Sequence, residues 1–180
     1  MTSGKLAFTK KVVTDLVING KRMSLAHEAR VSLLDLLRER LHITGTKKGC
    51  NEGACGACTV LIEGKRVNAC MTLAASCDGG EIRTIEGLAG DDGVLHSVQQ
   101  AFIDHDAFQC GYCTAGQVVS AVACVEEGHT SSAPEISEWM SGNICRCAAY
   151  PQIVAAVQQA ARQTKRCDAG FRLCSRCEHR

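Results

Sequence analysis

The first part of the chain carries short apolar runs broken by turn residues, which predicts a small β-sheet made of hairpins. Residues 12–18 are rich in Val and Ile, Asn19 and Gly20 supply the two positive-φ positions of a tight turn, and residues 21–25 return. The same signal recurs between residues 59 and 69. That second hairpin comprises residues 59–62, the turn Glu63–Gly64 and residues 66–69, and residues 82–85 form a further strand-like segment.

Between the two hairpins, the apolar positions change to a helical spacing. Ser32 is suited to cap a helix, and Asp35 follows in its first turn. Arg38 and Arg40 lie in the last turn, where their positive charges favour the negative end of the helix dipole. We therefore expect one helix crossing the hairpin, with an apolar stripe formed by Leu33, Leu34, Leu36, Leu37 and Leu41.

Strand signals stop where Gly and Asp gather, across residues 86–93. Beyond this point the pattern predicts four short helices, with Gly or Pro at their ends. They span residues 94–105, 114–127, 132 or 134 to 140, and 151–163. The predicted fold class is α+β, with domains at 1–86 and 87–164 and a cysteine-containing tail at 165–180.

Composition and charge exclude several classes of partner. The chain has 180 residues, 46% of them hydrophobic, which is ordinary for a globular protein of one or two small domains. Lys and Arg total 20 against 19 for Asp and Glu, so the net charge of +1 favours neither nucleic acid nor an anionic membrane. Residues 1–11 lack the hydrophobic core of a secretory signal, and a cytoplasmic location is expected.

Cysteine is the unusual residue, with 13 copies that cluster unevenly. Without a secretory signal, such a density indicates metal binding or redox chemistry rather than a disulfide framework. Four lie in residues 50–70, four in residues 110–147, and three in the tail. Cys77 and Cys124 stand apart, and both are interpreted as small buried hydrophobes. The scattered histidines are interpreted as surface or capping residues: His27, His42, His96, His105 and His129.

The first cysteine set is Cys50, Cys55, Cys58 and Cys70. Its C-x4-C-x2-C run, followed by a more distant cysteine, is the plant-type ferredoxin spacing for a 2Fe–2S cluster. Glycines between the cysteines allow the backbone to wrap closely around a cluster and to point amide hydrogens at sulfur. Structural zinc is the alternative, although zinc sites usually use C-x2-C knuckles.

The second cysteine set is Cys110, Cys113, Cys145 and Cys147. It combines a C-x2-C pair and a C-x-C pair, each at the amino end of a predicted helix, where unpaired amides favour thiolates. By spacing alone, zinc remains an open alternative because paired cysteines on a helical scaffold serve both metals. The ferredoxin-like loop on the same chain favours a second iron–sulfur cluster.

Three runs of sequence are similar to a known family. They are GTKKGCNEGACGACTVLIEG (residues 45–64), QCGYCTAGQ (109–117) and SGNICRCAAYPQI (141–153). These runs resemble the iron–sulfur small subunits and domains of the xanthine oxidase family of molybdenum hydroxylases, particularly those of bacterial aldehyde oxidoreductases. The resemblance covers about residues 12–163.

The resemblance implies an N-terminal β-grasp 2Fe–2S ferredoxin domain followed by a four-helix-bundle 2Fe–2S domain. It implies that the first set ligates a cluster nearer a flavin and the second set a cluster nearer molybdenum. Gln109 and Cys147 match positions that lie against the pterin of the molybdenum cofactor. That cofactor is expected on a large subunit and FAD on a medium subunit of a heterotrimer. The chain would then conduct electrons and would not be catalytic on its own.

Two departures from the family pattern lie in the second set. Ala115 stands where Pro is frequent, and Ala148–Ala149 replace Thr-Gly. The residues stay small, so the turn is expected to pass close to the pterin, but a Cβ at residue 149 leaves open whether the glycine-specific backbone geometry is kept. The alternative functions are a free-standing soluble two-cluster ferredoxin and a zinc-binding structural protein. Gln109 and residues 141–150 favour the enzyme subunit, because a diffusing carrier has no need of them.

Overall fold

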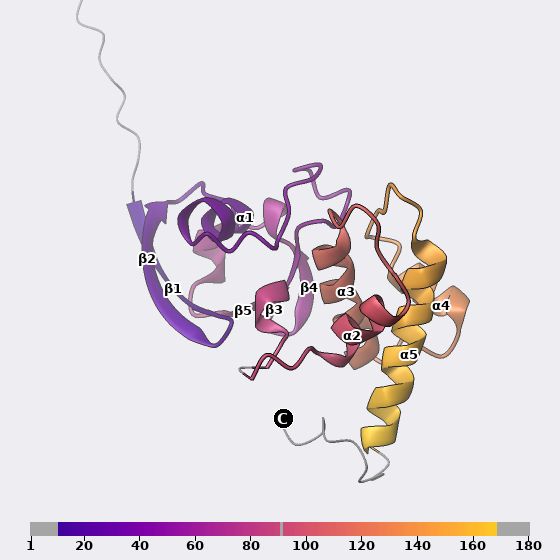
Figure 1. Ribbon diagram of the computed structural model, residues 1–180. Helices are drawn as coiled ribbons and strands as arrows, with labels where there is room; N and C mark the ends of the chain where they lie inside the picture. Colours follow the sequence, from indigo (N-terminus) through magenta and orange to yellow (C-terminus); the bar gives the residue numbers. More distant parts are fainter. Residues whose placement is uncertain (1–10, 91, 169–180) are drawn as a thin grey trace, which may run out of the picture.

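The computed structural model describes residues 11–90 and 92–168, with side chains described as far as residue 164. A half that contains the sheet lies beside a half built of helices, and α3 lies between the sheet and α5 (Figure 1). Within the described residues, no helix is long and apolar enough to cross a membrane. The predicted cysteine-containing tail lies outside the described residues, apart from the backbone of residues 165–168 at the end of the last helix.

Both predicted hairpins are present, and each turns at the predicted dipeptide. Strands β1 (Lys11–Ile18) and β2 (Lys21–Glu28) pair antiparallel across Asn19 (φ 50°) and Gly20 (φ 76°). Strands β3 (Thr59–Ile62) and β4 (Lys65–Asn68) pair across Glu63 and Gly64, also with positive φ. β2 is longer than predicted because backbone pairing with β1 continues to Glu28, past the end of its apolar pattern.

The shortest strand occupies the centre of the sheet. β5 (Glu81–Arg83) runs parallel to β1 and antiparallel to β3, and the strand order is β2-β1-β5-β3-β4. It ends earlier than residue 85 because Thr84 turns away from the strand to bond Asn19. The Thr84 amide donates to Asn19 Oδ1 (2.9 Å), and Asn19 Nδ2 donates to Thr84 Oγ1 (2.9 Å).

The helix over the sheet begins where predicted but is not regular. Ser32 Oγ accepts a hydrogen bond from the Asp35 amide (3.1 Å) at the start of α1 (Leu33–Asp35). The chain then widens into a π-helical turn, Leu36–Arg40, instead of the regular α-helix that was predicted. At this end Arg38 donates to the carbonyls of Thr44 and Thr46, which draws the following loop back onto the helix. The buried leucines of this segment are Leu33, Leu34, Leu36 and Leu37.

All four predicted helices are present, with shifted ends. They are α2 (Ser97–Asp104), α3 (Thr114–Glu126), α4 (Ala133–Trp139) and α5 (Tyr150–Asp168). α2 begins later than residue 94 because His96 caps it: His96 Nδ1 accepts from the Val98 amide (3.2 Å), and Gln99 Oε1 accepts from the His96 amide (2.9 Å). This confirms the capping role expected for one histidine.

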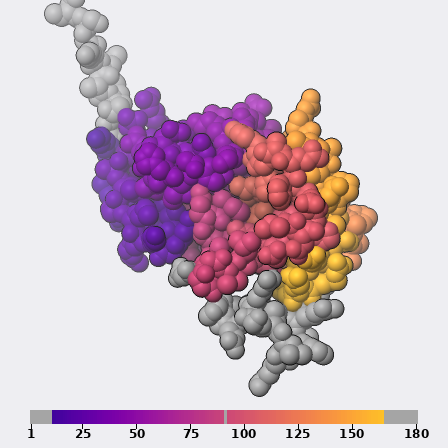
Figure 2. Space-filling view, in the orientation of Figure 1, coloured from indigo at the N-terminus to yellow at the C-terminus, as the bar shows by residue number. Residues whose placement is uncertain are grey.

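The two halves share strand β3. Val60 packs into the core formed with the leucines near α1, whereas Leu61, pointing to the opposite face, joins the core of the helical half. Both side chains are almost completely buried. The sheet is therefore covered on both faces at this strand, and the two halves meet along a continuous boundary in the space-filling view (Figure 2).

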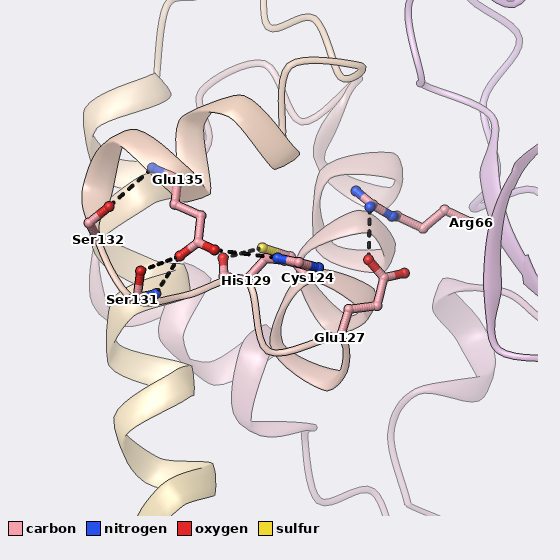
Figure 3. Close-up of polar contacts among 7 residues, drawn as sticks. All are labelled: Arg66, Cys124, Glu127, His129, Ser131, Ser132 and Glu135. Atoms are coloured by element: carbon pink, nitrogen blue, oxygen red, sulfur yellow. Dashed lines mark hydrogen bonds and ion pairs between the residues drawn. The ribbon is translucent and has the colours of Figure 1, made fainter.

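Arg66 on β4 makes a second connection between the halves. Its guanidinium donates to the Trp139 carbonyl (2.7 Å), pairs with Glu127 (3.0 Å) and lies 4.9 Å from the Trp139 ring centroid. The Trp139 ring stacks in turn on His129, with 3.6 Å between centroids. Figure 3 shows Arg66 reaching Glu127, while His129 faces Glu135 on the next helix.

One histidine contradicts the sequence interpretation. His27 on β2 is fully buried, not a surface or capping residue, and its Nε2 lies 2.9 Å from Thr14 Oγ1 on β1. His27 pairs with Val12, so Thr14 is its diagonal neighbour on the paired strand, and each satisfies the other's polar atom away from water. Cys77 and Cys124 are buried, as predicted.

Candidate functional site

The loop after the π-helical turn carries Cys50 and Cys55 and directs its own backbone amides at their sulfur atoms. Cys50 Sγ accepts hydrogen bonds from the amides of Glu52 (3.4 Å) and Ala54 (3.2 Å), and Cys55 Sγ accepts from the Cys50 amide (3.4 Å). This path needs left-handed backbone at several positions, which glycine adopts without strain. The positive-φ residues of the loop are Asn51, Gly53 and Gly56.

The other two cysteines of this set come from the second hairpin. Cys58 immediately precedes β3, and Cys70 lies in the 3-10 turn Ala69–Met71 that follows β4. The thiol of Cys50 has that of Cys55 as its neighbour, the thiol of Cys58 has that of Cys70, and Cys55 also acts on Cys58. The structure thus brings the first set together as two neighbouring pairs.

The second set is assembled from the amino ends of two helices. Cys113 is the N-cap residue of α3, with Cys110 in the turn before it, and Cys145 and Cys147 lie just before α5. The Cys110 thiol contacts the Cys147 thiol, and the Cys113 thiol contacts the Cys145 thiol. The predicted set therefore converges, again as two pairs.

The thiols within each set have unequal acidity. The Glu52 amide lowers the pKa of Cys50 to about 7, and the Tyr112 amide lowers the pKa of Cys110. Burial raises the pKa of Cys58 to about 12, and burial does the same to Cys113. Each set therefore has one thiol with a lowered pKa and one with a raised pKa. Because metal ligation requires the thiolate, binding a metal must displace the proton of the second thiol.

Four thiols in two neighbouring pairs correspond to the ligand set of a 2Fe–2S cluster. Structural zinc requires four ligands around one centre, whereas a 2Fe–2S cluster takes four thiolates shared between two irons. Amide groups that already point at sulfur add donors that stabilise negative charge there.

The two cysteine sets are held side by side. The Ile144 amide, one residue before Cys145, donates to the Cys55 carbonyl (2.9 Å). The Tyr112 hydroxyl, between Cys110 and Cys113, donates to the Lys48 carbonyl (2.6 Å). In Figure 1 the loops before α3 and α5 lie at the same end of the molecule as the loop after α1.

A pair of glycines permits this close approach. A Cβ at Gly116 on α3 would lie 2.2 Å from the Gly56 carbonyl oxygen, and a Cβ at Gly56 would lie 2.4 Å from the Gly142 carbonyl oxygen. Contacts this short are prohibited for real side chains, so both positions require glycine. The loop of the first set is therefore inserted directly between α3 and the segment that precedes Cys145.

The two departures from the family pattern have local explanations. Ala115 lies in the first turn of α3, where either Ala or Pro is accommodated because the amide needs no partner in the helix. Ala149 does not adopt the positive-φ backbone of a glycine, and it is buried in the helical core. The left-handed residue is Ala148, with φ 58°, because the chain must reverse between Cys147 and α5.

The surface around the second set is unusually apolar. Gln109 and Cys110 are exposed, and Cys147 is half-buried. Four large side chains next to these cysteines in the sequence are 40–51% exposed: Phe108, Tyr112, Ile144 and Tyr150. The sequence interpretation did not identify these residues as part of the site, nor the buried polar side chains Gln117, Ser120 and Asn143, although two of these interrupt the apolar run of α3.

Two family models match the chain, one in each half. The model described as "2Fe-2S iron-sulfur cluster binding domain" matches residues 16–80, and the one described as "[2Fe-2S] binding domain" matches residues 84–158. Each match contains one cysteine set.

Curated relatives and solved structures agree with these matches. The chain is 54% identical over 165 residues to the aldehyde oxidoreductase iron–sulfur-binding subunit PaoA of Escherichia coli (strain K12), covering 83% of this chain and 72% of that protein. It is 47% identical to the nicotine 6-hydroxylase small subunit of Paenarthrobacter nicotinovorans, covering 83% and 90%. The structure of quinoline 2-oxidoreductase from Pseudomonas putida superposes with a TM-score of 0.82 at 40% identity, covering 87% of this chain and 97% of that one.

Proposed function

This chain belongs to the iron–sulfur small subunits of the xanthine oxidase family of molybdenum hydroxylases, and we propose that its two cysteine sets form the electron route through such an enzyme. Its function is electron transfer, based on two 2Fe–2S domains. The chain is part of an oxidoreductase and performs no substrate chemistry itself. The observation that carries the proposal is the convergence of eight thiols into two sets of neighbouring pairs.

The proposed ligands are the cysteines of the two sets. Cys50, Cys55, Cys58 and Cys70 would hold the first cluster, with Cys50 beside Cys55 and Cys58 beside Cys70. In the second set the pairs are Cys110 with Cys147 and Cys113 with Cys145. When bound, each cluster accepts and releases one electron. The amides directed at sulfur stabilise the added negative charge, and the buried thiols keep water away.

The proposed partners lie on either side of this route. The exposed apolar residues around the second set are suited to docking the molybdenum-binding large subunit, with Gln109 and Cys147 against the pterin of its cofactor. An FAD-binding medium subunit would then receive electrons from the first set. Because the relatives include an aldehyde oxidoreductase subunit at 54% identity, an aldehyde is the proposed substrate of the assembly, bound on the large subunit.

The finer description of the fold belongs to the same proposal. The half that contains the sheet corresponds to a β-grasp domain of residues 1–86, and α2–α5 correspond to a four-helix bundle within residues 87–164. The end of β5 at Arg83 and the start of α2 at Ser97 support a boundary between them, since the last strand of the sheet and the first helix of the bundle lie on either side. We also propose a cytoplasmic location, as expected from the sequence.

The proposal is tested on the purified full-length chain, prepared without oxygen. We expect four irons per chain and two distinct 2Fe–2S signals by electron paramagnetic resonance after reduction. Cys124→Ala is the matched control, because Cys124 is buried but belongs to neither set, and its iron content should equal that of the wild type. A colourless protein that contains zinc, or a 4Fe–4S spectrum, would contradict the proposal.

Substitution of single ligands assigns the two signals. Cys50→Ala should remove one signal and leave the other, while Cys147→Ala should do the reverse, because the two ligands belong to different sets. Cys147→Ala should also slow reduction by substrate in the assembled enzyme. Loss of both signals from either variant would show that the sets do not bind independent clusters.

A further inference from the structure

A buried side-chain amide joins the two cysteine sets. Asn143 is 6% exposed and lies two residues before Cys145. Its Nδ2 donates to the Gly56 carbonyl (2.9 Å), in the loop of the first set, and to Thr59 Oγ1 (3.3 Å), at the start of β3 just after Cys58. Its Oδ1 accepts from Ser120 Oγ (2.6 Å) on α3, the helix that begins after Cys113. All polar atoms of this amide are therefore used, each toward a segment that carries cysteines of one set or the other.

The backbone beside Asn143 makes the same connection. Gln117 Nε2 on α3 donates to the Asn143 carbonyl (2.9 Å), and the next residue, Ile144, donates to the carbonyl of Cys55. Gln117 and Ser120 are each 1% exposed, so these bonds lie away from competing water. A buried bond of this kind is costly to break, because the remaining partner is left unsatisfied.

We propose that Asn143 is a positioning residue that fixes the separation and orientation of the two cysteine sets, and thereby the rate of electron transfer between them. The inference rests on the proposed function. The step is the transfer of one electron, by which the second-set site is oxidised and the first-set site is reduced. No bond forms or breaks in the chain. Asn143 touches no reacting atom, and acts only through the two loops that it holds.

The test uses Asn143→Ala and Asn143→Asp in the full-length chain loaded with iron. Asn143→Asp keeps the size and the acceptor for Ser120 but removes the donor to the Gly56 carbonyl. In both variants we expect four irons, two signals, and a changed magnetic splitting between the two reduced clusters, because this splitting depends on their distance and orientation. Electron equilibration between the clusters after a pulse of reductant should slow relative to the wild type, because the two loops are no longer held at their native separation.

Thr14→Val is the matched control, since it also removes a buried hydrogen bond, to His27, but in the outer hairpin. It should leave both the splitting and the equilibration rate unchanged. If Asn143→Ala loses iron, Ser120→Ala is measured in its place, because it removes only the donor to Asn143 Oδ1. It should change the splitting and the equilibration rate in the same direction, but less. The inference is overturned if Asn143→Ala leaves the splitting and the rate unchanged, or if Ser120→Ala does so where Asn143→Ala has lost iron. It is also overturned if Thr14→Val changes them equally. Absence of two clusters from the wild type would instead refute the proposed function.

Discussion

At the scale of single residues, Ala148 carries the clearest local strain in the site. It holds φ 58° between Cys147 and α5, a conformation that costs a residue with a Cβ about 1–2 kcal/mol and costs glycine little. The turn is retained because the cysteine before it and the buried Ala149 after it are both fixed by packing. The strain is thus imposed by the convergence of the second set and not by the local sequence.

Replacing Ala148 with Gly should therefore stabilise the chain. We expect a gain of about 1 kcal/mol, which for a protein of this size raises the thermal midpoint by about 3 °C. The matched control is Ala149→Gly, which should lower the midpoint, because Ala149 is buried and has no positive φ to relieve. Circular dichroism of the iron-loaded proteins measures both. A lower midpoint for Ala148→Gly would show that the Cβ contributes more in packing than it costs in strain.

At the scale of elements, helix α2 depends on a histidine that must stay neutral. His96 Nδ1 accepts a hydrogen bond from the Val98 amide, and a protonated ring has no lone pair for it. Burial, and then the charge of Arg83, lower the pKa of His96 below its ordinary value. The unfolded chain therefore binds the proton first, so stability is present above the ordinary pKa and is lost as the pH falls through it.

This gives a prediction about the pH dependence of stability. Between pH 8 and pH 5.5 the thermal midpoint of the wild type should fall, beginning near pH 6.5, the ordinary pKa of histidine. His96→Asn keeps a side-chain cap that does not titrate, so its midpoint should fall less over the same range. At pH 8 the two proteins should differ little. Identical slopes in wild type and variant would exclude His96 as the source.

At the scale of the whole molecule, the two halves are joined by interactions of unequal strength. Arg66 makes a hydrogen bond, an ion pair and an aromatic contact at once, with its side chain 21% exposed. Arg83 also crosses the boundary, to Glu126 on α3, but at 3.7 Å and with both side chains more than a third exposed. Only the first arrangement is desolvated and multidentate enough to hold the halves together.

Arg66→Met should accordingly lower the free energy of unfolding by about 2 kcal/mol, the size of a hydrogen bond to a charged group. Arg83→Met should cost less than about 1 kcal/mol, as for an exposed ion pair. Thermal midpoints of the two variants make the comparison, and hydrogen exchange at β4 and α4 should rise only in the first. Equal effects of the two substitutions would argue that the contacts of Arg66 do not hold the two halves together.

Local features of the fold were predictable because their causes are local. Asn19–Gly20 and Glu63–Gly64 dictate hairpin turns by their tolerance of positive φ, and Ser32 dictates a helix start through a bond to a residue three positions on. The composition of the two cysteine sets was likewise readable from spacing, because each set combines short-range runs with a characteristic interval. The sequence did not single out His96 as the cap of α2, because the helical pattern was extended back to residue 94.

Long-range features were decided only by the tertiary structure. No local pattern placed β5 at the centre of the sheet, divided Val60 and Leu61 between two cores, buried His27, or required left-handed backbone at Ala148. Each results from a pairing or a close approach between segments far apart in the chain. The sequence by itself determined which residues are suited to hold iron and where the chain turns. The tertiary structure alone decided how near the two sets lie, because that distance depends on Asn143, Gly56 and Gly116 meeting across the boundary.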